Sequence, residues 1–482
     1  MNDLAEKALH GLNAARREIV ARPMISFAVA GLLLAGVVVA ADARISAAGP
    51  TRPLSTWFGL ADAVRHREWL PGTIMLCATI ALALLWLGIV RFARRREQPE
   101  SRVWWVAAAW ALPFVLGPPL LGTSAQTYVA FGLLQRHGLS PYDFGPSRLA
   151  GSDIVAAIEP SARDTPSSAG PLGTLVQHLA VSISSGSALG ALVVLRGLGV
   201  LCWVFIGRFA ADLAGPGRSR ALTLTTLNPL VLFYVVSAAR LEGLLLVFVL
   251  AALNAAVQRR WAAAIALACV AGSVTAQGFL ILPAIVAVHL LGRRTVPAWL
   301  MLARDLLVAA VTTVLAALVV SDGFGWLGTV SKQFAAHPPY SVASGVANLL
   351  KPIVEGASYD DLAAGARVTV LTAMVCVLSY LVSTARQRSL ERTAGYALLA
   401  LGLLAPVLYP WYLLGGLVCL APAATGVRRV LVLALSVAGC LMYPPGFSPT
   451  TADVLTGVAL GVIALVLLSL PSVRRLLPDP AT

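Results

Sequence analysis

Apolar runs of 17 to 22 residues recur along most of the chain, and they constrain its fold more than any other feature. A run of this length can cross the hydrocarbon core of a bilayer, about 30 Å thick, as an α-helix. Backbone groups inside a bilayer must find internal partners, and the alternation typical of barrel strands is absent. Only 12% of the 482 residues are charged, against about 25% in soluble proteins. The sequence therefore predicts an all-α polytopic membrane protein.

Short arginine clusters lie between the apolar runs. They occupy residues 91–98, 259–260, 293–294, 386–392, 428–429 and 474–475. Loops rich in Lys and Arg stay on the cytoplasmic side of a membrane. The net charge of +14 is therefore interpreted as cytoplasmic loops, and no nucleic-acid partner is expected. We expect a multi-pass protein of the cell membrane with both termini in the cytoplasm.

The alternation of clusters and apolar runs predicts about 14 transmembrane helices, within a range of 12 to 14. Three of them are expected at about 221–238, 411–425 and 453–471, and the weakly apolar residues 171–185 are expected at the membrane interface. Residues 1–22 are expected to form a cytoplasmic amphipathic start, residues 23–472 one membrane domain, and residues 473–482 a cytoplasmic tail. Two long polar stretches, about 123–186 and 321–366, fall on the extracytoplasmic side. These outer loops are expected to contain amphipathic helices and are the stretches long enough to build a site.

Sequence motifs that hold metals or soluble cofactors are missing. The six cysteines lie inside apolar runs without metal or redox spacing, and the six histidines form no HExxH or HxH pattern. No P-loop or GxSxG occurs. We therefore expect no metal ion and no cofactor, and an outward-facing site would instead use a lipid-carried donor.

The stretch "SAARLEGLLL" places Arg240 and Glu242 at the outer end of a predicted helical hairpin. Ionisable groups at the edge of a membrane are costly to bury unless they are paired, so they are candidates for function. Glu242 and Arg240 are therefore candidate functional residues. A purely structural interfacial ion pair is the alternative interpretation.

The first outer loop carries further candidates. Asp143 lies in "SPYDFGP" and Asp164 in "ARDTPSSAGP", where Arg163 precedes it, and each acid is a candidate functional residue. Both also fit a turn-forming role, because Asp side chains stabilise turns next to Pro and Gly.

Aromatic residues gather near the predicted outer surface. "LYPWYLL" contains Trp411 and Tyr412, which would line a lipid-binding wall or belong to the interfacial aromatic belt. "AAHPPYS" in the second outer loop offers His337 and Tyr340.

Four of these stretches together resemble one family. The stretches are "YVAFGLLQRHGLSPYDFGP", "DTPSSAGPLGTL", "LNPLVLFYVVSAARLEGLLL" and "YPWYLLGGL". From about residue 55 to 425 the chain resembles the GT-C integral-membrane glycosyltransferases, nearest the actinobacterial α-1,6-mannosyltransferases that use polyprenyl-phosphomannose. The resemblance implies a GT-C-like helical bundle. It also implies inverting transfer of a sugar, with mannose expected, from a polyprenyl phosphate to a cell-envelope glycan outside the membrane.

Key positions of the family depart from its pattern in this chain. The resemblance places Ser124 where the family has its catalytic Asp, and Ala169 where it has a Tyr. Arg240 falls in the family's His-Asn-acid stretch, where Glu242 alone keeps the acid. A serine hydroxyl has little basicity near neutral pH, and loss of a positioned base costs about 10²–10⁴ in rate.

Three functions remain compatible with the sequence. The first is an active transferase with a relocated base, chosen among Glu242, Asp164 and Asp143. In this hypothesis Arg240 or Arg163 would hold the donor phosphate. The second is a catalytically inactive homologue that binds polyprenyl lipid or glycan, or that supports a partner membrane transferase. The third is a lipid transporter, although the inverted repeats of transporters are not visible.

Overall fold

The structure of the chain is a computed structural model that describes residues 23–48, 69–149, 151–292, 297–335, 341–354, 356–405 and 408–442. Within these ranges the regular structure is helical, and no strand occurs. The predicted cytoplasmic start, the tail and the span expected at 453–471 lie outside the described residues. So do His337 and Tyr340.

The first three helices pack against one another. They are α2 (Pro23–Ala48), α3 (Trp69–Arg95) and α4 (Glu100–Leu116), and α2 contacts both of the others. The Trp110 indole donates a hydrogen bond of 2.8 Å to the Phe27 carbonyl. This bond joins α4 to α2 inside an otherwise apolar interface.

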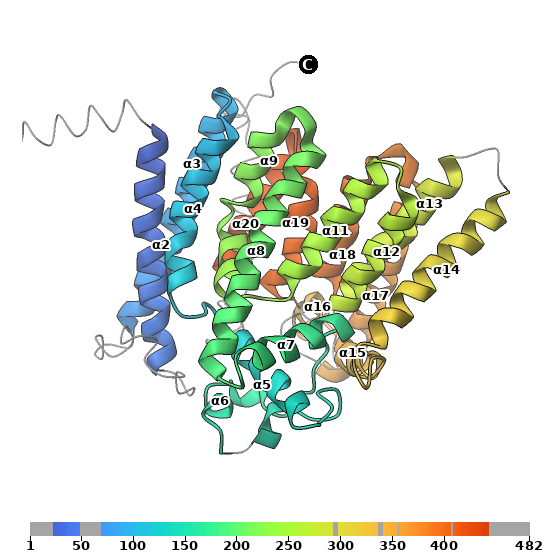
Figure 1. Cartoon of the computed structure of the whole chain (residues 1–482), viewed down its shortest axis with the longest axis horizontal. Helices are drawn as coiled ribbons and strands as arrows, with labels where there is room; N and C mark the ends of the chain where they lie inside the picture. Colours follow the sequence, from blue (N-terminus) through green and yellow to red (C-terminus); the bar gives the residue numbers. More distant parts are fainter. Residues whose placement is uncertain are drawn as a thin grey trace, which may run out of the picture.

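The first outer loop folds into short helices at one end of the molecule (Figure 1). They are α5 (Ser124–Arg136), η2 (Pro146–Leu149), α6 (Asp153–Ala156), η3 (Pro160–Ala162) and α7 (Pro171–Ile183). Helix α7 corresponds to residues 171–185, which are only weakly apolar in sequence and were expected at the membrane interface. Gly132 of α5 lies so close to α7 that an added Cβ would be 2.3 Å from the Gln177 carbonyl oxygen. The two helices therefore form one tightly packed layer.

The central part of the chain contains the long helix α8 and a series of shorter pieces. These are α8 (Ala188–Ala214), η4 (Gly215–Gly217), α9 (Arg218–Thr225), α10 (Pro229–Val231), η5 (Leu232–Ser237), α11 (Glu242–Val257), α12 (Trp261–Val274), η6 (Ala276–Ile281) and α13 (Leu282–Gly292). Residues of α8, α10, η5, α11 and α12 supply much of one continuous apolar core.

The rest of the chain completes this core. The helices are α14 (Ala298–Ala317), α15 (Trp326–Ala335), α16 (Val342–Leu350), α17 (Tyr359–Ser383), η7 (Ala385–Gln387), α18 (Leu390–Leu404), η8 (Pro410–Tyr412), α19 (Leu413–Leu420), η9 (Ala421–Ala423) and α20 (Gly426–Leu441). Helices α18, α19 and α20 pack in sequence order, and α20 also contacts α3. The start and the end of the described chain therefore meet.

The structure describes fewer uninterrupted spans than the 14 predicted. Within the described ranges five helices are long and apolar enough to cross a membrane, and a sixth span is possible if a bent pair is counted as one. Residues 221–238 and 411–425 were expected as single helices. Each contains a proline, Pro229 or Pro422, at which the helical geometry changes. The count of 14 is thus not confirmed, whereas the all-helical, multi-pass architecture is.

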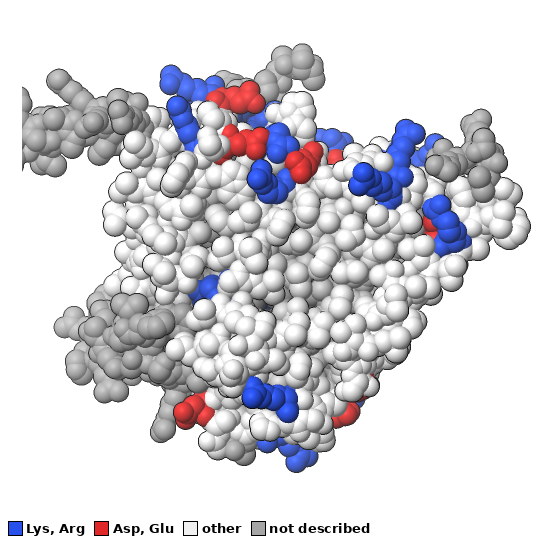
Figure 2. Space-filling model, in the orientation of Figure 1, with Lys and Arg blue, Asp and Glu red and all other residues white. Residues whose placement is uncertain are grey.

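Charge is distributed as expected for a membrane protein. On the face shown in Figure 2, charged side chains gather near the two ends of the molecule and leave a broad band that is almost uncharged. Large apolar side chains are exposed along the candidate spans, among them Leu84, Leu201 and Leu315. Such a surface is stable against lipid tails and unstable in water.

One buried arginine ties α8 to the end of α4. Arg196 is only 5% exposed, and its Nη1 donates hydrogen bonds to the carbonyl oxygens of Phe114, Val115 and Gly117. The last carbonyls of a helix have no partner within the helix and carry partial negative charge. Arg196 satisfies them and so fixes the point at which the chain leaves α4 towards α5.

We expect Arg196→Met to lower the thermal stability of the detergent-solubilised protein clearly. Hydrogen bonds to charged groups contribute about 1.5–3 kcal/mol each, and their loss leaves buried carbonyls unsatisfied. Arg208→Met is the matched control, because Arg208 is an exposed arginine of the same helix. Equal melting temperatures for the two variants would contradict this role for Arg196.

Candidate functional site

A sharp reversal of the chain creates the candidate site. The helical pair 229–237 and 242–257 is bent by 114° at a short break, and Ala239 in the break has a φ of +48°. The preceding segment η5 is a π-helix, a rare form that often occurs at functional sites. The Arg240 amide donates to the Tyr234 carbonyl at 3.0 Å, which holds the reversal in place. Arg240 and Glu242 therefore project from a constrained turn.

Arg240 is nearly buried and is surrounded by three different kinds of partner. Its side chain is 10% exposed and that of Glu242 is 8% exposed, with 3.2 Å between Arg240 Nε and Glu242 Oε2. Its Nη1 donates to Ser124 Oγ at 2.5 Å. The guanidinium carbon lies 3.5 Å from the centre of the Trp411 ring, in a cation–π contact. A buried charge with such partners is stable but costly to separate from them.

Ser124 reaches Arg240 because it is the first residue of α5. The preceding turn is strained, since Leu121 has a φ of +57°, and the Leu121 amide donates to Asp42 Oδ1 at 3.2 Å. Tyr128 lies one helical turn after Ser124 on the same face of α5. The charges of Arg240 and Glu242 act on its hydroxyl. Helix α5 thus brings two polar side chains to the reversal.

Aromatic rings cover another side of Arg240. Tyr409 stacks on Trp411 with 4.3 Å between ring centres, and Tyr412 meets both rings edge-on. Tyr234 lies 5.6 Å from Trp411, and its buried hydroxyl has no hydrogen-bond partner among the described residues. An apolar wall with one unsatisfied hydroxyl is suited to a ligand that has both an isoprenoid and a polar part.

Ala169 lies beside the reversal. An added Cβ on Gly173 would be 3.1 Å from Leu241 Cδ1 and 3.2 Å from Ala169 Cβ, so these residues are neighbours. Ala169 is buried, and the Gly170 amide donates to the Val274 carbonyl at 2.9 Å. Ser124 and Ala169, two positions at which the resemblance implies a departure from the family pattern, therefore both lie near the Arg240–Glu242 pair.

Asp143, Asp164 and Arg163 do not join this cluster. Asp143 and Asp164 are exposed to solvent in the first outer loop. Arg163 donates to the backbone carbonyls of Ile158 at 2.9 Å and Ala156 at 3.3 Å, which supports the loop itself. The structure gives these three residues the geometry of turn and loop formation.

The loop around Asp143 is anchored by its neighbour Tyr142. The Tyr142 hydroxyl is 2.8 Å from Thr174 Oγ1 on α7. Burial raises the pKa of Tyr142 to about 12, so the phenol stays neutral at physiological pH. This contact joins the turn to α7 while Asp143 faces outwards.

Sequence reasoning missed two acids near the cluster. Asp42 is fully buried at the end of the first apolar run, and its Oδ2 has no partner among the described residues. Its charge acts on Tyr234. Glu159 is half-buried, its amide donates to Thr123 Oγ1 at 3.2 Å, and its charge acts on Tyr409. An acid at the end of an apolar run was a signal for Asp42, whereas no sequence pattern distinguished Glu159 from other loop acids.

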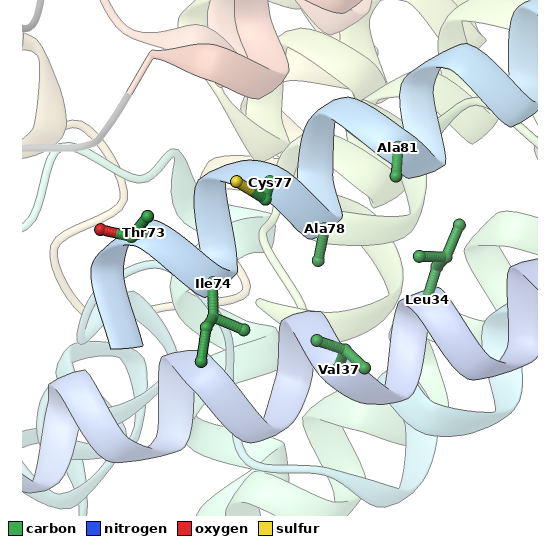
Figure 3. A pocket seen from close by; sticks show the side chains of 7 residues that line it. All are labelled: Leu34, Val37, Thr73, Ile74, Cys77, Ala78 and Ala81. Atoms are coloured by element: carbon green, nitrogen blue, oxygen red, sulfur yellow. The ribbon is translucent and has the colours of Figure 1, made fainter. Parts of the chain in front are cut away.

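Neither a metal-binding group nor the hollow between α2 and α3 adds catalytic side chains among the described residues. Among the described residues there is no group of three or more His, Cys, Asp or Glu arranged to hold a metal ion. A hollow of about 370 Å³ between α2 and α3 is lined by apolar side chains with Thr73 and Cys77 (Figure 3). It has no charged lining and lies apart from Arg240.

The energetic coupling between Arg240 and Glu242 can be measured with a double-mutant cycle. We expect Arg240→Met and Glu242→Gln to show an interaction free energy of about 0.5–3 kcal/mol in thermal unfolding. Each substitution alone leaves the remaining charged side chain buried without its partner. The exposed pair Arg218–Glu100 is the control, with an expected coupling of about 0–1 kcal/mol. Additive effects at Arg240 and Glu242 would contradict the buried pairing.

Comparison with known proteins assigns the chain to a family. Residues 27–292 match the alpha-(1->6)-mannopyranosyltransferase N-terminal domain of the MptA/MptB family, and residues 341–470 match the MptB C-terminal domain. Alpha-(1->6)-mannopyranosyltransferase A of Mycobacterium tuberculosis is 29% identical over 395 residues, which are 77% of this chain and 76% of that protein.

Two further relatives agree with this assignment. Alpha-(1->6)-mannopyranosyltransferase B of Corynebacterium glutamicum is 28% identical over 407 residues, covering 76% of this chain and 67% of that protein. A probable alpha-(1->6)-mannopyranosyltransferase of Mycolicibacterium smegmatis is 25% identical over 465 residues, with 85% and 81% covered. The chain is a multi-pass membrane protein that belongs to the alpha-(1->6)-mannopyranosyltransferase family.

Proposed function

We propose that the chain transfers a mannosyl unit from polyprenyl-phosphomannose to a hydroxyl of a cell-envelope glycan, on the extracytoplasmic side of the membrane. The buried Arg240–Glu242 pair, beside Ser124 and the aromatic wall, is the observation that carries this proposal. The family relationship supports the sugar and the reaction type. No metal ion or other cofactor is part of the proposal.

Arg240 is the proposed ligand of the donor phosphate. Guanidinium groups bind phosphates through charge-assisted hydrogen bonds, and such bonds are stronger where water is excluded. Within the described residues, the second terminal nitrogen of Arg240, Nη2, has no hydrogen-bond partner. Trp411 and Tyr412 would contact the first isoprene units of the lipid. Developing charge on the leaving phosphate would then be stabilised by a group that is already in place.

Glu242 is the proposed base. The acceptor hydroxyl attacks the anomeric carbon, the bond from that carbon to the phosphate oxygen breaks, and polyprenyl phosphate leaves with the bonding electrons. The hydroxyl proton passes to the Glu242 carboxylate. Of its two oxygens, Oε2 faces Arg240, and no described residue donates a hydrogen bond to Oε1. Inversion at carbon is the stereochemistry expected from the family resemblance.

A non-catalytic role is the second candidate, and one contact favours it. Ser124 stands where the family resemblance places an acid, and its hydroxyl is held by Arg240. A site in which the cation is satisfied by internal partners could bind polyprenyl phosphate, or support a partner transferase, without transferring sugar.

We expect Glu242→Gln to lower mannosyl transfer by about 10²–10⁴, because the amide cannot accept the proton. The measurement is transfer of labelled mannose from polyprenyl-phosphomannose to a mannan-like acceptor in membranes. Asp143→Asn and Asp164→Asn are the controls and should stay near the wild-type rate, since both residues are exposed. A wild-type rate for Glu242→Gln would rule out Glu242 as the base.

The departure at Ser124 gives a second test. Ser124 Oγ lies at the same guanidinium as Glu242, so a carboxylate introduced there would occupy the neighbourhood of the reacting hydroxyl. We expect Ser124→Asp to restore part of the activity of Glu242→Gln, measured as the rate of the double variant against the single one. Ser124→Asn is the uncharged control and should restore nothing. If the wild type binds polyprenyl phosphate but transfers no mannose, the non-catalytic role is supported instead.

A further inference from the structure

A second group of charged side chains lies at the opposite end of α11 from Glu242. The 16 residues of α11 separate the two places by about 24 Å along the helix, at 1.5 Å per residue. Here Arg259, Arg260, Trp261, His289 and Arg304 line a hollow of about 390 Å³. The hollow is formed by the α11–α12 turn, the end of α13 and the start of α14. The proposed mannosyl transfer does not use it.

A buried pair of side chains supports the floor of this hollow. His289 is 1% exposed and Asp305 is completely buried, with 2.6 Å between His289 Nδ1 and Asp305 Oδ2. The other carboxylate oxygen, Oδ1, accepts from Arg304 Nη2 at 3.1 Å. Trp261 stacks on the His289 ring, with 4.9 Å between ring centres. These contacts fix both His289 and Arg304, and leave Nε2 as the histidine nitrogen without a partner among the described residues.

The charge balance of the hollow favours an anion. Three guanidinium groups line the hollow. The Asp305 carboxylate contacts two of the lining residues, His289 and Arg304. Arg259 and Arg260 are exposed, and the Arg304 side chain is half exposed. The donors of Arg259 and Arg260, and those of Arg304 that are not directed at Asp305, can thus reach a ligand. Arginine forks match the oxygens of a phosphate in geometry as well as charge.

The backbone at Arg259 ends α11 in a tight turn. Arg259 has a φ of +61°, in the left-handed region that a glycine would adopt at lower cost. Its amide donates to the Ala256 carbonyl, and the Arg260 amide donates to the Ala255 carbonyl, both at 2.9 Å. The tight turn aligns the two arginine side chains beside Trp261.

The surroundings of the hollow indicate a lipid. Val257, Trp299 and Leu300 are exposed apolar residues next to the arginines. Tryptophan beside arginine at the end of a span is typical of the level of lipid headgroups. Basic pockets between transmembrane helices bind the phosphates of anionic lipids. A phosphate bound here would have its acyl chains beside this apolar surface.

We propose that Arg259, Arg260 and Arg304 bind a phosphate group at the membrane face opposite the mannosyl site, and that this phosphate belongs to an anionic membrane lipid. The chemistry recognised is a phosphate anion beside an apolar surface. Inorganic phosphate is the other source of the same anion, and the experiment separates the two. The site is distinct from Arg240 and needs no catalytic activity for its detection.

The test uses the full chain in detergent. Binding of short-chain phosphatidylglycerol, phosphatidylcholine and inorganic phosphate is measured by native mass spectrometry and by thermal shift. We expect phosphatidylglycerol to bind, and its affinity to fall on the order of a hundredfold in Arg259→Gln/Arg260→Gln/Arg304→Gln, at about fivefold for each arginine. Phosphatidylcholine should bind weakly to both proteins. If inorganic phosphate binds as tightly as phosphatidylglycerol and competes with it, the proposal that the bound phosphate belongs to a lipid is overturned.

A matched variant controls for loss of charge. Arg95→Gln/Arg96→Gln/Arg220→Gln removes three exposed arginines elsewhere and should bind phosphatidylglycerol like the wild type. Arg259→Gln/Arg260→Gln leaves the buried His289–Asp305 pair intact and should still lower the affinity at least tenfold, even if the triple variant folds poorly. Equal losses in the pocket variants and in the control variant would overturn the proposal. Polyprenyl phosphate binding through Arg240 should not change in any of these variants.

Discussion

The charge of Arg240 has to be accommodated in a largely apolar interior, and the architecture around it follows from this requirement. Three segments distant in sequence meet at this guanidinium: the start of α5, the stretch that runs from Tyr234 through the bend to Glu242, and the aromatic turn at residues 409–412. Each segment supplies a different group that stabilises the positive charge, namely a hydroxyl, a carboxylate or an aromatic face. Separating any of them would expose a buried charge, so these contacts also define how the segments are arranged.

The same cluster links stability to the proposed chemistry. A cation already held by Glu242, Ser124 and Trp411 needs little reorganisation when a phosphate approaches, which is the condition for electrostatic catalysis. The cost is that Glu242 serves two purposes. As the partner of Arg240 it stabilises the fold, and as a base it would have to accept a proton beside that positive charge. Arg196 contributes indirectly, because it fixes the end of α4 from which the chain runs to Ser124.

The membrane class, the family and the pairing of Arg240 with Glu242 could be predicted from the sequence, because they depend on local composition and on neighbours in the chain. The contact of Ser124 with Arg240 could not, since 116 positions separate them. Asp143 and Asp164 had the residue type expected of a base, but the structure exposes both side chains to solvent. Their exposure depends on how the loop folds on α7, which the sequence does not show. The predicted spans at 221–238 and 411–425 failed as single helices, because an average of apolarity over a window does not register the effect of Pro229 or Pro422 on helical geometry. The expectations on residues 453–471, His337 and Tyr340 stay predictions.

The length of α11 has a consequence for the depth of the site. Its 16 residues extend about 24 Å, while a hydrocarbon core measures about 30 Å. If Arg259 lies at one boundary of that core, Glu242 lies several ångströms beneath the other boundary, and any tilt of the helix increases this depth. A donor phosphate would therefore have to descend below its normal level in the membrane to meet Arg240. The first outer loop, folded over this end as α5, α6 and α7, would then form the wall of a polar recess within the bilayer rather than a lid on its surface.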